Sequence, residues 1–239
     1  DFINTNIMGT YNLLQASLDY YNNLDSNKKY DFKFIHVSTD EVFGSIENNE
    51  KFTETSQYNP TSPYSASKAS SDHLVNAWYK TYGLPVITSN CSNNFGPYQF
   101  PEKLIPLMIL RCLELDSLPI YGTGLNIRDW LYVFDHCEAL HLMIKKGKIG
   151  QTYNVGANTE KTNLEIVNII CDLMTVKKPL ENKLTYNSLI EFVDDRPGHD
   201  FRYAIDSSKI INELGWKPKF TFEESLSSTI DWYLENEKW

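Results

Sequence analysis

Cysteine is scarce in this sequence: only four of its 239 residues are cysteines, and they stand far apart. The paired short spacings of a zinc site are absent, and so is the density of a secreted disulfide framework. We therefore expect buried, reduced thiols. The histidines at positions 36, 73, 136 and 141 form no metal-binding pair on one helical face, and we predict no metal.

Positive charge is also in short supply, because 22 Lys and Arg face 31 Asp and Glu and leave a formal net charge of -9. Nucleic-acid binding normally begins with basic patches that neutralise phosphates, so we expect no nucleic-acid partner. An anionic substrate would need locally placed cations. No apolar run approaches the roughly 18 residues of a membrane-spanning helix, and the first residues lack a signal-peptide pattern. We expect a cytoplasmic protein without a membrane partner.

Helix and strand patterns alternate over the first 90 residues. The expected order is helix, strand, helix and strand, at residues 4–21, 32–37, 62–82 and 85–90, with a polar loop at 22–31. Such alternation with long crossovers is typical of a parallel sheet covered by helices. We predict an α/β fold with a doubly wound, Rossmann-like parallel sheet.

In the rest of the chain the expected strands are short. Short strands are expected around 118–121, 131–133 and 152–155, between helices near 103–115, 135–146, 163–175, 207–214 and 222–235. We assign residues 1–92 to the first domain and 93–239 mainly to a smaller mixed α/β lobe, with about 127–160 partly returning to the first sheet. No G-x-G-x-x-G-like cluster occurs, so we expect the doubly wound sheet to lack its first βα units.

Tyr64 and Lys68 stand four residues apart in the expected helix 62–82, and therefore on one helical face. A neighbouring ammonium lowers the pKa of a phenol and makes it a usable base toward a sugar hydroxyl. This spacing also arises by chance in many helices, where it marks a surface contact. On its own, the pair is weak support for a catalytic site.

The segment Thr39-Asp40-Glu41 directly follows the expected strand 32–37, at the edge where open α/β sheets place ligand-contacting groups. When repulsion between two adjacent carboxyls separates their pKa values, one stays protonated and acts as an acid while the other is ionised and acts as a base. A solvated acidic turn is the alternative. The Tyr64 and Lys68 pair on the next helix favours a catalytic site.

Three segments together resemble the extended short-chain dehydrogenase/reductases: 38–44 (STDEVFG), 64–68 (YSASK) and 90–98 (NCSNNFGPY). With the later segments 100–106, 119–122, 127–133 and 195–200, they more closely resemble the dTDP-glucose 4,6-dehydratase family. The resemblance spans essentially the whole chain. An ordered set of this kind is far more specific than any single motif within it.

The resemblance implies NAD-dependent dehydration of a nucleoside diphosphate glucose to the 4-keto-6-deoxy sugar. Tyr64 would take the O4 proton while hydride leaves C4 for NAD, and Thr39 would hydrogen-bond O4. Glu41 would then remove the C5 proton as Asp40 protonates the departing C6 hydroxyl. The implied cofactor-binding residues are Ser38, Tyr64, Lys68 and Asn94.

A nucleotide sugar also needs a nucleotide site. Pro119 and Tyr121, two apart on a short strand, point to one face and would form an apolar wall against a pyrimidine, with core packing as the alternative. Arg128, Arg196 and His199 would supply the cations for a diphosphate, with surface ion pairing as the alternative. The resemblance further implies substrate contacts from Thr39, Asn93, Lys103, Leu104 and Asn163, and a homodimer formed through helices 4–21 and 62–82.

Several alternatives stay open at this point. The substrate is either dTDP-glucose or UDP-glucose, because the two bases differ by one methyl group. A sister epimerase or decarboxylase is the second reading, although Asp40 and Glu41 argue against a simple C4 epimerase, which eliminates no water. GDP-mannose dehydratases resemble the same pattern with Ser in place of Asp40. A non-catalytic nucleotide-sugar-binding fragment is the third reading, since without a Gly-rich loop we expect the chain alone to bind NAD poorly.

Overall fold

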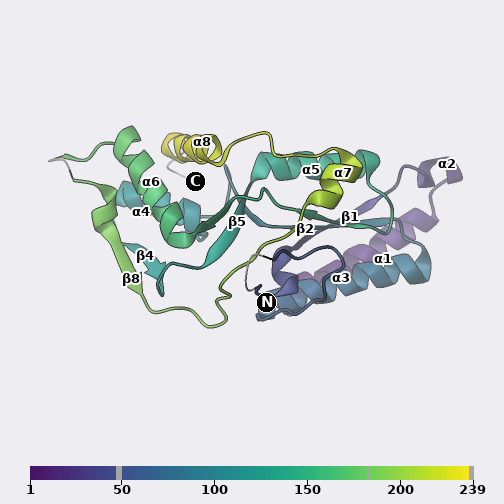
Figure 1. The fold of residues 1–239 in the computed structure, drawn as a ribbon. Helices are drawn as coiled ribbons and strands as arrows, with labels where there is room; N and C mark the ends of the chain where they lie inside the picture. Colours follow the sequence, from purple (N-terminus) through teal and green to yellow (C-terminus); the bar gives the residue numbers. More distant parts are fainter. Residues whose placement is uncertain (47–49, 182–183, 237–239) are drawn as a thin grey trace.

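The computed structural model describes residues 1–46, 50–181 and 184–236. Figure 1 shows an elongated molecule of two parts, with a helix-covered sheet on the right and helices around shorter strands on the left. The functional residues expected from the sequence come from both parts.

A parallel sheet forms the centre of the first part. Its strands lie in the order β1 (Phe34–Thr39), β2 (Val86–Cys91) and β6 (Thr152–Val155). One face is covered by η1 (Ile3–Met8), α1 (Gly9–Asn22) and α3 (Pro63–Tyr82), and the other by α5 (Val133–Lys146) and α7 (Ser208–Leu214) (Figure 1). Helices on both faces of a parallel sheet make a doubly wound arrangement, which confirms the predicted fold class.

Each face of this sheet has its own apolar core. Val86 packs with Leu14 and Val75 on the side of α1 and α3. Its neighbour Ile87 packs with Met143 on the side of α5. Successive strand residues point to opposite faces, and burial of each such side chain is worth about 1.5 to 3 kcal/mol. The continuous apolar sequence of the strand therefore stabilises both layers.

The second part packs three helices around a separate core: α4 (Leu104–Glu114), α6 (Asn163–Lys177) and α8 (Phe222–Glu235). Its strands are β3 (Asn93–Phe95), β5 (Ile127–Tyr132) and β7 (Glu160–Thr162) in one sheet, and β4 (Leu118–Tyr121) and β8 (Ile190–Val193) in a parallel pair. The described chain also has the short helices α2 (Ser26–Lys29), η2 (Asp40–Phe43) and η4 (Tyr186–Leu189).

Local sequence signals fix the limits of α3, the helix that carries Tyr64 and Lys68. Ser62 caps its first turn by accepting from the Ser65 backbone N–H, and the Ser65 hydroxyl bonds back to the Ser62 backbone. Pro63 occupies the first turn, where its missing N–H costs nothing. Gly83 ends the helix in the left-handed conformation.

The chain after β8 returns from the second part to α7 in the first (Figure 1). On the way it bonds, through backbone atoms, to the segment that follows η2. The Ile46 N–H donates to the Arg202 carbonyl at 3.0 Å, and the Phe52 N–H donates to the Ala204 carbonyl at 2.9 Å. Residues 202–205 therefore form a main-chain link between the two parts.

The structure differs from the sequence expectations in several elements. The first helix starts as the π-helix η1, the expected loop 22–31 contains α2, and the strand expected at 131–133 spans Ile127–Tyr132. The strands β3, β7 and β8 were not expected. Of the cysteines, Cys112 and Cys171 are buried but Cys137 is exposed, so the expectation of buried thiols is wrong for Cys137.

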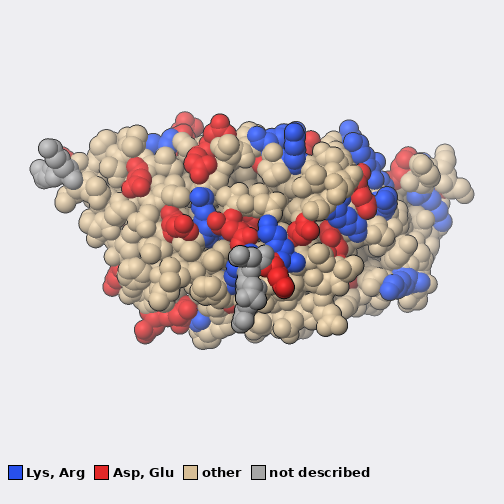
Figure 2. Space-filling model, viewed as in Figure 1, with Lys and Arg blue, Asp and Glu red and all other residues tan. Residues whose placement is uncertain are grey.

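The surface carries charges of both signs. Figure 2 shows acidic and basic side chains interspersed over one face and gathered near its middle. Within residues 1–46, 50–181 and 184–236, no helix combines the length and apolarity required to cross a membrane. The same residues contain no group of three or more His, Cys, Asp or Glu side chains that would hold a metal ion.

Candidate active site

The candidate site lies where β1 and β2 end. The turn η2 follows β1 directly and carries Asp40 and Glu41. The helix α3 packs against both β1 and η2. Thr39 caps the turn, since its hydroxyl oxygen accepts from the Glu41 backbone N–H at 3.3 Å. The same hydroxyl donates to Asp40 Oδ1 at 3.3 Å. Thr39 therefore sets the positions of both carboxyls.

Gly44 ends the turn in a conformation that other residues rarely adopt, with φ 83° and ψ −167°. A Cβ atom at this position would lie 2.4 Å from the Asn59 carbonyl oxygen. The backbone of residue 59 thus packs directly against the end of the turn η2. Only glycine allows this close approach.

We expect Gly44→Ala to destabilise the protein and to displace the turn. The backbone conformation alone costs about 1 to 3 kcal/mol, and the contact with Asn59 adds to that cost. Thermal unfolding and activity measurements on the purified variant test this. Gly83→Ala is the matched control, since Gly83 also has positive φ but has nothing within 4 Å of the added Cβ, and it should cost only about 1 kcal/mol. Equal stability losses in the two variants would contradict the role given to Asn59.

Asp40 is buried, with 2% of its surface exposed, and its Oδ2 atom has no hydrogen-bond partner among the described residues. Burial raises the pKa of Asp40 well above its ordinary value, and the charges of Glu41 and Asp129 raise it further. The protonated form is therefore favoured, as a proton donor requires. The sequence argument expected mutual repulsion to dominate, whereas burial is the larger cause.

Glu41 is less enclosed than Asp40. Burial raises the pKa of Glu41, while the guanidinium groups of Arg128 and Arg196 lower it. The two neighbouring carboxyls therefore lie in different environments, and the cations favour the ionised form of Glu41. This difference is the one needed for an acid and a base in adjacent positions.

Tyr64 lies in the first turn of α3, the helix that packs against η2, and the charges of Glu41 and Asp40 both act on its ionisation. Burial raises the pKa of the Tyr64 phenol, and Glu41 raises it further. The expected lowering by Lys68 is therefore wrong for the chain without ligands. The Lys68 ammonium instead donates to the Val37 carbonyl at 2.8 Å, a contact that helical spacing alone does not reveal.

The residues expected to bind a cofactor lie at the same strand ends. Ser38 donates to Asp72 Oδ2 at 2.9 Å, and Asn94 Oδ1 lies 2.9 Å from His136 Nδ1. Burial lowers the pKa of His136 to about 4, so its ring is neutral near pH 7 and Nδ1–H donates to Asn94. The buried His136 Nε2 has no partner within the described chain. A phenol, an ammonium and a fixed amide are polar groups that fit a nicotinamide riboside.

Arg128 is 5% exposed, and its guanidinium bonds to backbone carbonyls. It donates to Ile127, Phe201 and Asp200 at 2.7, 3.2 and 2.8 Å, and it stacks on the Tyr203 ring at 4.3 Å. Both terminal nitrogens have carbonyl partners in this structure. The contact of Arg128 with a phosphate stays a prediction.

The other basic side chains expected to contact the substrate differ in exposure, since that of His199 is only 5% exposed. Lys103 precedes α4 and pairs with Glu102 at 3.0 Å, with 59% of its side chain exposed. His199 Nδ1 bonds Asp195 Oδ1 at 2.6 Å. The charge of Arg196 acts on Glu41, so the segment 195–200 lies near the catalytic turn.

The remaining residues expected to contact the substrate lie in β4 or at the first position of a strand or helix in the second part. Pro119 and Tyr121 share one face of β4, where Tyr121 is 48% exposed, while Leu118 and Ile120 face the core. Core packing thus does not account for Tyr121. The other three residues are Asn93 at the start of β3, Leu104 at the start of α4 and Asn163 at the start of α6.

Sequence reasoning missed several buried polar residues around this site. Asp72, on the helical face of Tyr64 and Lys68, accepts hydrogen bonds from two strands and a loop. The spacing of four from Lys68 was a signal that was available. Asp129 is 1% exposed and acts on Asp40 from β5, and Cys91 acts on Tyr64 from β2. Their proximity comes from sheet pairing, which has no local sequence signal.

A buried acid, a less enclosed base and a Tyr-x-x-x-Lys helix at the ends of parallel strands define a short-chain dehydrogenase/reductase that modifies nucleotide sugars. The family described as GDP-mannose 4,6 dehydratase matches residues 1–229. The dTDP-glucose 4,6-dehydratase of Xanthomonas campestris is 56% identical over 238 residues, covering 100% of this chain and 68% of its own.

Solved structures give the same result. The dTDP-glucose 4,6-dehydratase of Bacillus anthracis, in complex with NAD, is 49% identical with a TM-score of 0.85 over 99% of this chain and 70% of its own. The dTDP-glucose 4,6-dehydratase of Streptomyces venezuelae, also with NAD, is 42% identical with a TM-score of 0.88. The match covers 98% of this chain and 67% of that protein. The chain belongs to the dTDP-glucose 4,6-dehydratase family.

Proposed function

We propose that the protein containing this chain catalyses the NAD-dependent dehydration of dTDP-glucose to its 4-keto-6-deoxy derivative. The observation that carries this proposal is the division of labour between Asp40 and Glu41 beside Tyr64. Burial raises the pKa of Asp40 well above its ordinary value, whereas its effect on the pKa of Glu41 is opposed by the charges of Arg128 and Arg196, so that Glu41 is the more readily ionised of the two. Family membership supports the same reaction.

In the proposed reaction the residues of this chain make four proton transfers. Tyr64 takes the O4 proton as C4 is oxidised, with Thr39 hydrogen-bonded to O4. The new ketone acidifies C5, Glu41 removes its proton, and Asp40 protonates the C6 hydroxyl, which leaves as water. Bound NAD would supply the hydride chemistry, accepting hydride from C4 and returning it to C6. Glu41 gives its proton back to C5, and exchange with water takes the proton from Tyr64 and restores that of Asp40.

We propose that Ser38, Lys68 and Asn94 hold the riboside and amide portions of NAD, together with Tyr64. Lys68 is 2.8 Å from the Val37 carbonyl and retains further donors for a ribose. The Asn94 amide is oriented by His136. The contributions of these residues to NAD affinity are measurable by titration calorimetry.

We further propose that the nucleotide occupies the second part. Tyr121 offers an exposed ring for the base, and Arg196 offers a cation for the diphosphate. Burial lowers the pKa of His199, so His199 would contribute a hydrogen bond and not a full charge. Arg128 would contact a phosphate through the N–H groups that its bonds to the Ile127, Phe201 and Asp200 carbonyls leave over. The nucleotide sugar would also contact the remaining substrate-binding residues expected from the sequence, Asn93, Lys103, Leu104, Pro119 and Asn163.

The domain division belongs to the same proposal. Residues 1–92 would serve mainly the cofactor, and 93–239 mainly the nucleotide sugar, with about 127–160 shared. Within the second range, 182–183 and 237–239 lie outside the described residues. The pairing of β6 with β2 supports a shared segment. A cytoplasmic location and the absence of a nucleic-acid partner stay predictions from the sequence.

A deoxythymidine nucleotide is favoured over a uridine nucleotide by the relatives rather than by a residue of the site. The two bases differ by one methyl group, for which a pocket discriminates by only about 1 to 3 kcal/mol. Competition between dTDP-glucose and UDP-glucose measures this difference directly. The test of the function itself is the incubation of the protein and NAD with dTDP-glucose, followed by the alkali-induced absorbance of a 4-keto sugar. No such absorbance, with NAD bound, would refute the proposed function.

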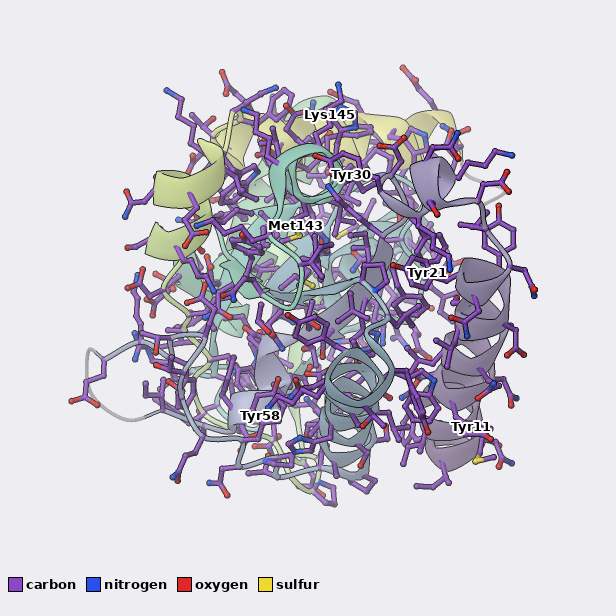
Figure 3. The ribbon with its side chains drawn as sticks, turned by 90° about the vertical axis from the view of Figure 1, so that its right-hand side faces the viewer. Tyr11, Tyr21, Tyr30, Tyr58, Met143 and Lys145 are labelled. Carbon is purple, nitrogen blue, oxygen red and sulfur yellow. The ribbon has the colours of Figure 1, made fainter. Side chains whose placement is uncertain are left out.

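We also propose that the protein is a homodimer formed through α1 and α3. Figure 3 shows α1, with Tyr11 and Tyr21, along one side of the molecule. Leu13, Tyr20 and Tyr82 on these helices are 63%, 60% and 54% exposed. An apolar surface of this kind is typical of a protein interface.

Leu13→Glu should convert the dimer to a monomer, because a carboxylate buried in an apolar interface loses its hydration without a partner. Sedimentation velocity measures the change. Val176→Glu on α6 is the control, since Val176 is 78% exposed on another helix and the dimer should persist. If the Leu13 variant sedimented as the wild type does, the interface would lie elsewhere.

A further inference from the structure

The buried carboxylate of Asp72 is a hydrogen-bond centre between α3 and the sheet. Its Oδ1 atom lies 2.8 Å from His36 Nε2, and its Oδ2 atom accepts from Ser38 and Tyr58 at 2.9 Å each. The Asn90 amide lies 3.4 Å from Oδ2. Asp72 is 6% exposed, so nearly all of its stabilisation comes from these donors and not from water.

These four donors come from three different segments. His36 and Ser38 are on β1, Asn90 is on β2, and Tyr58 comes from the loop that precedes α3. Tyr58 is labelled in Figure 3, and its ring also contacts Phe43 of the turn η2 at 5.3 Å. A single carboxylate therefore holds together the elements that carry the catalytic residues.

The contacts with β1 occur in register just before the catalytic turn. Asp72 bonds the side chains of His36 and Ser38, while Lys68, one helical turn earlier on α3, donates to the carbonyl of Val37 between them. Three consecutive residues of β1 are thus held by α3. Asn90, bonded to Asp72, also donates to the Thr39 carbonyl at 3.0 Å.

Asp72 also places a negative charge on the helical face of Lys68. Burial lowers the pKa of Lys68, and the charges of Asp72 and Cys91 oppose that change. The titratable groups around the pair are Tyr64 on α3, Cys91 on β2, His36 on β1 and Tyr58 on the preceding loop. Two charged groups act on Lys68, those of Asp72 and Cys91. Of the two, only Asp72 lies on the same helix as Lys68, and its carboxylate has four hydrogen-bond donors.

We infer that Asp72 is a positioning residue of the dehydratase site: it fixes the spacing between α3 and the Thr39–Glu41 segment, and it sets a negative charge one helical turn from Lys68. This inference rests on the proposed function. Asp72 does not touch the reacting atoms and acts through Lys68, Ser38 and Asn90. Its substitution should therefore lower kcat with little change in the KM for the nucleotide sugar.

The test compares Asp72→Asn with Tyr58→Phe. Asp72→Asn keeps the shape but removes the charge, whereas Tyr58→Phe removes one hydrogen bond and keeps the charge. We expect Asp72→Asn to lower kcat about 10- to 100-fold, since small displacements of catalytic groups have effects of that size. The alkaline limb of the pH profile of kcat should move about one to three pH units lower in Asp72→Asn, because Lys68 loses its proton more readily. Tyr58→Phe should leave the alkaline limb in place and lower kcat by less than about 10-fold.

A second readout needs no substrate and separates this inference from the proposed function. The titration of Lys68 is followed by NMR of 13Cε-labelled lysine in the protein, with Lys68→Met for assignment. A lower pKa in Asp72→Asn supports the inference even if dTDP-glucose is not the substrate. An unchanged Lys68 titration together with an unchanged pH profile would overturn it, even if thermal stability fell.

Should Asp72→Asn not fold, the double variant His36→Phe/Tyr58→Phe decides the positioning role. It removes two of the four donors and keeps the carboxylate. A kcat reduced by about threefold or more at constant KM supports the inference. A wild-type kcat in the folded double variant would overturn it.

Discussion

Glu41→Gln should stop the reaction after C4 oxidation, so that the enzyme accumulates NADH and releases no 4-keto-6-deoxy product. Glutamine keeps the shape of the side chain but cannot accept the C5 proton. The proposed oxidation uses Tyr64 and is not directly affected. Loss of a general base typically lowers the rate about 10²- to 10⁴-fold. Stopped-flow absorbance of NADH and quenched product assays measure the two steps separately.

The matched control for this variant is Glu114→Gln, at the exposed end of α4. It removes the same charge from a position in the second part, and we expect wild-type rates. A Glu41 variant that still eliminated water at the normal rate would show that another group removes the C5 proton. Asp40 would then be the first residue to test.

Tyr64→Phe should abolish the oxidation itself, with a rate loss of about 10²- to 10⁴-fold and no NADH formed after substrate is added. Phenylalanine keeps the ring that packs edge-on against Phe2 at 5.7 Å, so the fold should be retained. Only the hydroxyl beside Glu41 and Asp40 is lost. Single-turnover measurement of NADH distinguishes this defect from that of Glu41→Gln.

Tyr82→Phe, at the end of the same helix, is the control for Tyr64→Phe. Tyr82 is 54% exposed and its ring contacts Trp78, a contact that phenylalanine preserves. We expect no change in either step. Normal NADH formation in the Tyr64 variant would mean that the phenol is not the base for O4.

The larger elements could be predicted from the sequence because their signals are local. Ser62, Pro63 and Gly83 bound α3, and the apolar run before Thr39 indicates a buried strand. The three-residue strands β3 and β7 have no such signal, because three residues are too few to establish a period. Their existence follows from pairing with β5.

The candidate site shows the same limit. The residues carrying the chemistry stood out by type and spacing, but their hydrogen bonds did not. The Val37 carbonyl that binds Lys68 and the His36 ring that binds Asp72 are separated from their partners by 31 and 36 residues. The sign of the Tyr64 pKa shift was wrong because it depends on burial and on Glu41, which helical spacing does not include.

The return of the chain across the molecule at residues 202–205 has an evolutionary consequence. Ile46 and Phe52 are joined to this segment through amide and carbonyl groups that every residue except proline can supply. The side chains of the crossing are nevertheless fixed by their surroundings, since residues 202–205 are all buried and the Arg202 guanidinium bonds the Glu160 carboxylate. Homologues should therefore accept few substitutions in this segment, because a change there would disturb the loop behind Glu41 and the nucleotide part together.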